Sequence, residues 1–184
     1  MFLTEKVITS PLEINLSEMV FTEKDELFDK IEKKLLEEGF EIANIDKTRP
    51  WGGFFVINEE QAQKFANQYF EGLDVQDLKI SGKLSPKILV VAPNKRLSWQ
   101  YHHRRAEIWR VTHGEVAVVT STNDEEAQLK KLKVGDTIRL AQGERHRLIG
   151  LDDYGVVAEI WQHTESGNPS DEDDIVRVQD DFGR

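Results

Sequence analysis

Apolar residues near the start of the chain recur at the spacing of an amphipathic helix. Thr22 is placed to cap such a helix, with Asp25 three residues on, and Gly39 is placed to end it. Between them the apolar positions lie three or four residues apart, on one face: Leu27, Phe28, Ile31, Leu35 and Leu36. This pattern predicts an amphipathic helix that packs on the body of the protein.

A second helical stripe follows after a turn. Asn58 precedes two acidic residues that suit the first turn of a helix, and Gly72 marks its end. The apolar stripe consists of Phe65, Ala66, Tyr69 and Phe70. Between the two predicted helices, the run Arg49-Pro50-Trp51-Gly52-Gly53-Phe54-Phe55 predicts a turn that leads into a short strand.

From about residue 87 the pattern changes to short strands separated by turn residues. Eight strands are predicted, at 87–92, 97–102, 106–112, 115–121, 128–133, 137–140, 145–149 and 155–162. Short strands at this spacing are typical of an all-β sandwich or jelly-roll barrel. The acidic, turn-rich tail 166–184 is predicted by its composition to be a solvated arm, in which one strand could dock.

The composition describes one acidic domain without cysteine. A chain of 184 residues suits one domain, or one domain with an appendage. Without cysteine there are no disulfides and no thiolate metal sites, so any metal must be held by nitrogen and oxygen. Because no signal-peptide pattern and no long apolar run is present, we expect a cytoplasmic protein that does not enter the membrane.

The distribution of charge says more about partners than its sum. The net charge of -10 argues against nucleic acids and anionic membranes. Residues 87–110, however, hold six basic residues against one acid, and residues 139–147 hold three against one. This local positive charge could attract a small anionic substrate such as a sugar phosphate. The alternative interpretation is that these arginines point outward from strands and are simply solvated.

Four potential metal ligands lie in or beside the predicted strands. Gln100 and His102 are two residues apart and therefore project to the same face of a strand. Glu107 follows across a short turn, and His146 lies on a later hairpin. If that face is the barrel interior, two imidazoles, a carboxylate and an amide oxygen would surround one divalent metal ion of zinc, manganese, cobalt, nickel or iron. The other histidines are interpreted as structural or solvated: His103, His113 and His163.

The spacing of these ligands resembles the two sequence motifs of the cupin superfamily. The first motif is matched by Gln100-x-His102-x4-Glu107-x6-Gly114, with glutamine replacing the first histidine and Asn94 replacing the leading glycine. The second is matched by Gly135, Ala141, Gly143 and His146, with alanine replacing proline. The resemblance implies a double-stranded β-helix, a jelly-roll barrel, here with two peripheral α-helices.

Four separated blocks resemble, more narrowly, the type II mannose-6-phosphate isomerase family. They are Arg49-Pro50-Trp51-Gly52, the run from Leu97 to His103, His146-Arg147-Leu148, and the runs 172–177 and 180–184. The resemblance implies a cupin domain over 49–184, with an insertion at about 57–84 and a metal-site core at about 86–162. Residues 1–48 would form an N-terminal extension, and the acidic tail would be part of the domain.

The resemblance also implies an activity and its residues. The family interconverts mannose 6-phosphate and fructose 6-phosphate with a divalent metal, so a metal-dependent aldose–ketose isomerase working through an enediolate is expected. Glu159 matches a glutamate of the family and is the candidate catalytic base. The candidate phosphate-binding residues are Arg49, Arg105 and Arg147. Cupins commonly form dimers, so a homodimer is expected.

Three alternatives remain open. Trp161 stands where the family usually has glutamine, so the substrate could be another sugar or a heptose phosphate. Two histidines and a carboxylate on a cupin barrel would also serve a metal-dependent oxygenase. Finally, the chain could be a cupin that binds a sugar phosphate without turning it over.

Overall fold

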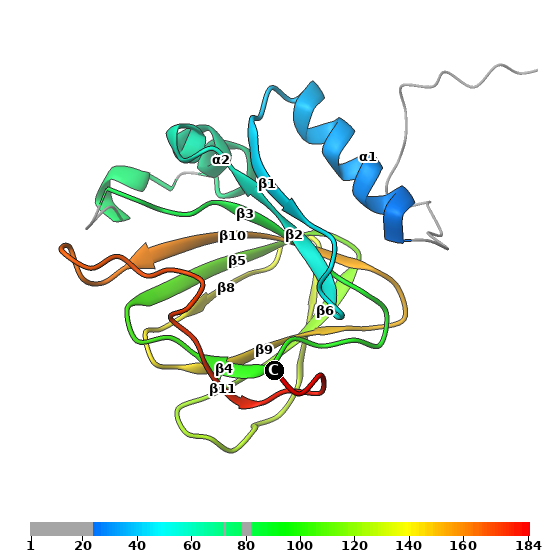
Figure 1. Ribbon diagram of the computed structural model, residues 1–184, viewed down its shortest axis with the longest axis vertical. Helices are drawn as coiled ribbons and strands as arrows, with labels where there is room; N and C mark the ends of the chain where they lie inside the picture. The colour runs from blue at the N-terminus through cyan, green and yellow to red at the C-terminus, as the bar shows by residue number, and fades with distance from the viewer. Residues whose placement is uncertain (1–23, 72, 79–81) are drawn as a thin grey trace, which may run out of the picture.

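Two antiparallel sheets face each other as the walls of a barrel (Figure 1). The computed structural model describes residues 24–71, 73–78 and 82–184. The six-stranded sheet has the order β1 (Ile42–Asp46), β2 (Gly52–Ile57), β3 (Lys87–Val91), β10 (Gly155–His163), β5 (Arg105–His113), β8 (Thr137–Leu140). The five-stranded sheet has the order β11 (Val176–Gln179), β4 (Trp99–Tyr101), β9 (Arg145–Gly150), β6 (Glu115–Ser121), β7 (Lys130–Lys133). The predicted all-β barrel is therefore confirmed.

The strand pattern in the sequence located the barrel well. All eight strands predicted from residue 87 onward are present, and their ends differ from the predicted ends by at most two residues. The turn after Arg49 leads into β2, as expected. The pattern missed β1, which pairs with β2 at the edge of the six-stranded sheet and has no buried residue. This strand lies inside the predicted N-terminal extension, so that segment adds a strand to the barrel as well as a helix.

Two helices cover the outer face of the six-stranded sheet (Figure 1). Helix α1 (Lys24–Glu37) buries the predicted stripe except Leu36, which is 55% exposed and points away. The second helix begins later than predicted, because Asn58 caps a 3-10 turn, η2 (Glu59–Gln61), before α2 (Ala62–Tyr69). A further 3-10 turn, η3, covers Val75–Leu78. The expected cap Thr22 and the expected end Gly72 lie outside the described residues.

Both faces of β3 are buried, which explains its unbroken apolar run. Ile88 and Val90 pack into the core under the helices, whereas Leu89 and Val91 pack into the core between the sheets. Such a strand, covered on both sides, reads as continuous hydrophobic sequence instead of alternating sequence. Lys87 has the parity of the inward residues, so it faces the barrel interior. In the described part of the chain, no helix has the length and apolar content needed to cross a membrane.

The tail is mostly exposed, as its composition predicted, but one strand and two buried residues anchor it to the barrel. Strand β11 pairs with β4, and the buried residues Ser170 and Asp174 precede it. The Asp174 carboxylate accepts hydrogen bonds from the backbone N–H groups of His103 and Arg104, each at 3.0 Å. Some of the acidic residues therefore satisfy backbone donors at the end of β4, a use that composition cannot reveal.

Candidate metal centre and adjoining cavity

Inward-facing residues of three neighbouring strands form two rows across the six-stranded sheet. On β10, Glu159 lies opposite Lys87 of β3 and Trp109 of β5. Two residues further along β10, Trp161 lies opposite Glu107 of β5. Residues two apart share a face, and directly paired side chains have Cβ atoms about 5 Å apart. The five side chains therefore gather at one place inside the barrel.

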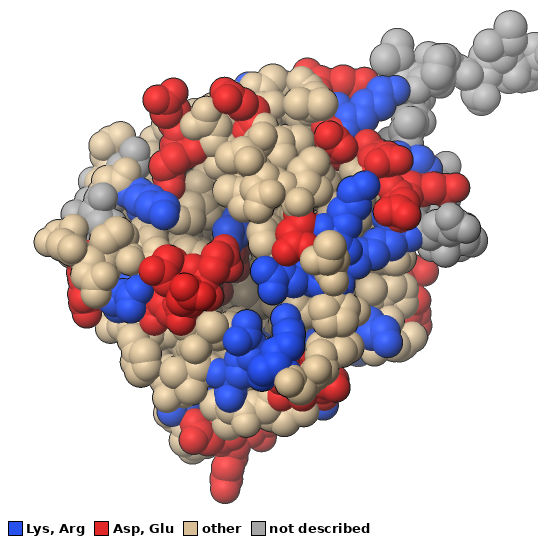
Figure 2. All heavy atoms as spheres, viewed as in Figure 1, with Lys and Arg blue, Asp and Glu red and all other residues tan. Residues whose placement is uncertain are grey.

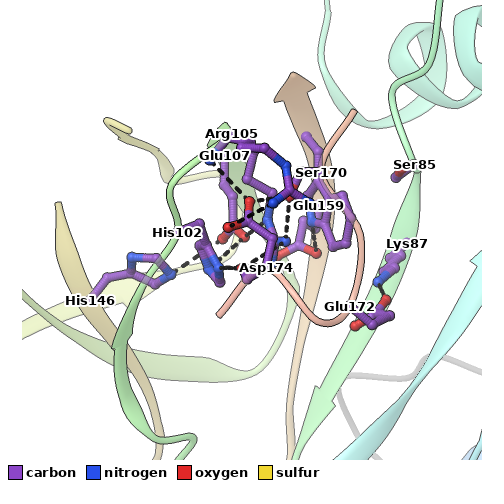
Figure 3. Close-up of polar contacts among 12 residues, drawn as sticks. Ser85, Lys87, His102, Arg105, Glu107, His146, Glu159, Ser170, Glu172 and Asp174 are labelled. Atoms are coloured by element: carbon purple, nitrogen blue, oxygen red, sulfur yellow. Dashed lines mark hydrogen bonds and ion pairs between the residues drawn. The ribbon is translucent and has the colours of Figure 1, made fainter. Parts of the chain in front are cut away.

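His102, Glu107 and His146 form a buried cluster at this place (Figure 3). The Nε2 atom of His102 is 3.2 Å from Oε1 of Glu107, and the Nε2 atom of His146 is 3.5 Å from Oε2 of the same carboxylate. All three side chains are at most 2% exposed. Glu107 belongs to the six-stranded sheet and His146 to the five-stranded sheet, so the cluster bridges the two walls of the barrel.

Backbone carbonyls orient both imidazoles toward the carboxylate. The Nδ1 atom of His102 is 2.7 Å from the carbonyl oxygen of Asp174, and the Nδ1 atom of His146 is 2.9 Å from that of Glu144. A carbonyl only accepts, so each ring carries its proton on Nδ1 when neutral. The Nε2 lone pairs then face Glu107, which is the arrangement of histidines that bind a metal.

The three residues of this cluster could hold one divalent ion. Two ligand atoms that are each about 2.1 Å from one ion, at octahedral or tetrahedral angles, lie about 3.0–3.4 Å apart. The observed separations, each to a different oxygen of Glu107, are 3.2 and 3.5 Å, and the three ligand atoms lie within 4.8 Å of one another. The buried Nε2 atom of His146 also has no hydrogen-bond partner among the described residues, and such atoms are rare unless something unseen binds them. Nitrogen and carboxylate ligands suit zinc, manganese, cobalt, nickel or iron.

Gln100, the fourth predicted ligand, lies beside this cluster. It is on β4, directly opposite His146 of β9, and it borders the cavity described below. Its Oε1 atom accepts a hydrogen bond of 2.5 Å from the Ser98 hydroxyl. That bond uses one lone pair of the amide oxygen and leaves the other. Gln100 as a metal ligand stays a prediction.

Glu107 is held in its charged form. Burial alone would raise the pKa of this carboxyl, but attraction to His102 in its protonated form and to Arg105 outweighs burial and places the pKa well below the ordinary value. Arg105 donates from Nε to Oε1 at 2.8 Å, and the Trp109 indole donates to Oε2 at 3.1 Å. A carboxylate that is already ionised is the form that binds a cation.

Glu159 is a second buried carboxyl with the opposite tendency. Burial and the neighbouring charge of Glu107 raise the pKa of Glu159 to about 7. The Trp109 indole donates to its Oε2 atom and the Trp161 indole to its Oε1 atom, at 2.7 and 2.8 Å. Two indoles thus fix the position of a group that can gain or lose a proton near neutral pH.

A cavity of about 210 Å³ opens between these carboxyl groups and the tail. Its buried end is lined by Glu107, Glu159, Trp109 and Trp161. The rest of the lining combines apolar side chains, among them Trp51 and Phe54, with charged ones: Arg49, Lys87, Arg105, Arg177, Arg184, Glu172 and Asp173. Figure 2 shows this face hollowed, with acidic side chains on one side of the opening and basic side chains on the other.

The three predicted phosphate-binding arginines have different positions. Arg49 lines the cavity, and its Nε atom donates to Asp46 at 2.8 Å. Arg105 also lines the cavity, but its guanidinium binds Glu107 and the tail residue Ser170 and lies 3.3 Å from Nε2 of His102. Arg147 lies away from the cavity and is 1% exposed. Its nitrogens donate to Leu97, Glu126 and Gln179. The structure therefore places Arg49 and Arg105, but not Arg147, beside the candidate site.

Sequence reasoning missed three residues of this site. Lys87 and Trp109 become neighbours of Glu159 only through the order of β3, β10 and β5, which are not consecutive in the chain. Asp174 lies in an acidic run whose composition does not distinguish it from its exposed neighbours. Among the histidines expected to be structural, His163 is fully buried and accepts a hydrogen bond from Ser170 N at 2.9 Å.

Fold and site together define a cupin whose barrel interior presents two histidines and a carboxylate. Comparison with protein families then identifies the family within the cupins. Residues 68–180, more than half of the chain, match the family described as "Mannose-6-phosphate isomerase C-terminal". The chain belongs to this family.

Curated relatives contain the same region as part of longer proteins. The chain is 32% identical over 136 residues to the xanthan biosynthesis protein XanB of Xanthomonas campestris, covering 74% of this chain and 23% of XanB. It is 36% identical over 98 residues to a mannose-1-phosphate guanylyltransferase of Escherichia coli, covering 53% and 19%. It is 33% identical over 105 residues to the alginate biosynthesis protein AlgA of Pseudomonas aeruginosa, covering 57% and 20%. The matched region is thus about a fifth to a quarter of these relatives' length.

Proposed function

We propose that this chain is a metal-dependent aldose–ketose isomerase acting on a sugar phosphate of the mannose 6-phosphate or fructose 6-phosphate type. The observation that supports it most is the pair of unlike carboxyl groups in one cavity. Glu107 is held ionised beside two histidines, whereas the pKa of Glu159 is raised to about 7. An isomerase of this type needs a cation site and a nearby group that can take and return a proton.

The residues suggest how the reaction would run. A divalent cation held by His102, Glu107 and His146 would supply positive charge to the carbonyl and hydroxyl oxygens of the sugar. In the aldose-to-ketose direction, Glu159 would take the proton from C2 and return it to C1, while the hydroxyl proton of O2 passes to O1, so that the two sugars interconvert through an enediolate. The two indoles would keep the carboxylate at the position where it reaches both carbons.

The family and its relatives support the class of substrate. A role in sugar-phosphate metabolism follows from the family description and from relatives named as mannose-1-phosphate guanylyltransferase and as xanthan and alginate biosynthesis proteins. The basic residues that line the cavity are consistent with an anionic substrate. Isomerisation itself, and the identity of the sugar, are our proposal for this chain.

One observation favours binding without turnover as a second candidate. The guanidinium of Arg105 donates to Glu107 and lies 3.3 Å from Nε2 of His102, so a positive charge already contacts two of the three candidate ligands. In a binding protein this arginine could replace the metal altogether. The two candidates differ in metal content and in turnover, which one experiment can measure together.

The test is a coupled assay of metal-reconstituted protein with mannose 6-phosphate, fructose 6-phosphate and a panel of other aldose and ketose phosphates, with bound metal measured in parallel. We expect turnover that Glu159→Gln reduces by about 100-fold or more while bound metal stays unchanged. Glu115→Gln, at an exposed position on β6, is the matched control and should behave as the parent. Absence of turnover on every sugar phosphate, with metal bound, would reject the isomerase. Binding of a sugar phosphate by protein without metal would support the second candidate.

A further inference from the structure

Lys87 is a buried lysine that faces the cavity. It is 4% exposed, and it stands opposite Glu159 at the start of β3. Its Nζ atom lies 4.1 Å from the centre of the Trp161 ring and 5.1 Å from that of Phe54. Lysines are almost never fully buried unless they are paired with an opposite charge. The Lys87 ammonium is therefore expected to pair with an anion.

Its partner in the structure is a replaceable one. Lys87 forms an ion pair with Glu172, a tail residue whose side chain is 59% exposed. Within the described part of the chain, the Glu172 carboxylate makes no other hydrogen bond or ion pair. Asp174 of the same tail differs, because its carboxylate accepts from His103 N, Arg104 N and the Ser170 hydroxyl. The buried Lys87 ammonium is thus paired with the Glu172 carboxylate, which could be displaced without loss of any other hydrogen bond or ion pair among the described residues.

Further positive charge surrounds the same point. Arg49 and Arg177 line the cavity with Lys87. The Arg49 guanidinium lies 5.5 Å from the centre of the Phe54 ring, the ring that Lys87 also contacts. Arg177 is exposed, and its guanidinium makes no hydrogen bond or ion pair with any residue that the structure describes. A phosphate group offers several charged oxygens and suits a site with more than one cationic donor.

We propose that Lys87, with Arg49 and Arg177, binds the phosphate group of the substrate, and that Glu172 is an internal competitor which occupies Lys87 until a phosphate displaces it. This inference rests on the proposed function and adds the residues that recognise the anion. In Figure 3 the pair of Lys87 and Glu172 lies on the side of Glu159 away from His102 and His146. A sugar phosphate bound in this way has its phosphate at one end of the cavity and its reacting carbons near Glu159.

The experiment measures binding of inorganic phosphate to the full chain, by calorimetry and by tryptophan fluorescence. Fluorescence is suitable because the Trp161 ring lies 4.1 Å from the Lys87 Nζ atom. Glu172→Gln keeps the shape of the side chain and removes the competing charge, so phosphate affinity should rise about three- to tenfold. Lys87→Met removes the ammonium, and affinity should fall about tenfold or more. In the double variant the gain from Glu172→Gln should disappear, because the competitor acts only through Lys87.

Asp173→Asn is the matched control. Asp173 lines the same cavity and is exposed and acidic, but within the described residues no hydrogen bond or ion pair joins it to Lys87. We expect its phosphate affinity to change less than about twofold. If Asp173→Asn raises the phosphate affinity as much as Glu172→Gln does, the gain comes from the loss of any negative charge near the cavity. The proposal that Glu172 competes with phosphate for Lys87 is then rejected. Because both substitutions are at exposed positions, this comparison decides the matter even if Lys87→Met fails to fold.

The result is separable from the fate of the proposed function. The phosphate titration needs no turnover, so the expected order of affinities would establish the subsite even in a protein that isomerises nothing. Conversely, a Lys87→Met variant that turns over a sugar phosphate with unchanged KM would overturn the subsite and leave the isomerase intact.

Discussion

The candidate site has two sides that are built from different kinds of structure, and we call them the strand wall and the tail wall. The strand wall consists of Glu107, His146 and Glu159, which come from three strands and are at most 5% exposed. The tail wall is the segment 170–177, which is mainly loop and reaches the barrel through one short strand, β11. In the strand wall, ladder hydrogen bonds fix the backbone under each functional side chain. In the tail wall, most positions depend on hydrogen bonds between side chains and backbone.

This difference indicates a division of tasks. Groups that must keep their geometry lie on paired strands, because rigid elements hold side chains more accurately than loops do. Glu172, which we propose a phosphate displaces, lies on the segment with fewer backbone pairings. His102 connects the walls, since its Nδ1 atom meets the Asp174 carbonyl of the tail and its Nε2 atom meets Glu107 of the strand wall.

The largest effect is expected on metal affinity, when both histidines of the cluster are replaced. His102→Ala combined with His146→Ala removes both nitrogen ligands and should weaken divalent-metal binding by more than about 1000-fold. The measurement is bound metal after dialysis, together with titration against a chelator of known affinity. His103→Ala, at an exposed position next to His102, is the control and should bind metal as the parent does. Equal affinity in the double variant would place the metal elsewhere.

Acid should loosen the tail wall through His163. Burial, with help from Lys83 and Arg105, lowers the pKa of His163 from 6.5 to about 4. Below pH 6.5 the unfolded chain therefore takes up a proton that the folded protein refuses, so stability present above pH 6.5 is lost progressively down to about pH 4. The loss is at most about 3 kcal/mol in the free energy of unfolding. Protonation would also cost the bond from Ser170 N to Nδ1, which anchors the tail.

The check compares unfolding by denaturant across pH 4 to 8 in the parent and in His163→Gln. Glutamine can still accept from Ser170 but does not titrate, so the variant should lose less stability on acidification. The carboxyl groups titrate in both proteins, and the difference between the two curves isolates the histidine. Parallel curves would mean that His163 has the same pKa in both states.

The sequence predicted the strand wall better than the tail wall. Alternation along a strand is a local property, so the shared face of Gln100 and His102 could be derived from their spacing alone. The row of Lys87, Glu159 and Trp109 could not, because it depends on which strands pair in three dimensions. The acidic composition of the tail resembled a solvated segment, whereas Asp174 uses its charge to bind backbone N–H groups. Resemblance to a family, unlike composition, predicted that the tail is part of the domain.

Asp174 tests how strongly the tail supports the cluster. Asp174→Ala releases the loop that presents its carbonyl to His102, so metal affinity should fall about tenfold, an effect on the cluster from a residue that is not a ligand. The measurement is chelator competition, with the unfolding temperature recorded to show that the barrel persists. Asp173→Ala, at the neighbouring exposed position, should leave metal affinity as it is. If both variants bind metal equally well, the strand wall is independent of the tail.

The smallest expected effect concerns Arg147, which the family resemblance suggested for phosphate. Its guanidinium is buried and does not line the cavity. It donates to the Leu97 carbonyl at 2.8 Å and to the Gln179 carbonyl of β11 at 3.3 Å. Because this residue fastens the tail and does not line the cavity, Arg147→Met should change phosphate affinity less than about twofold while lowering the unfolding temperature. Arg177→Met is the counterpart, since it should weaken phosphate binding with little effect on stability. The opposite pattern would assign anion binding to Arg147 and would move the phosphate site away from the cavity.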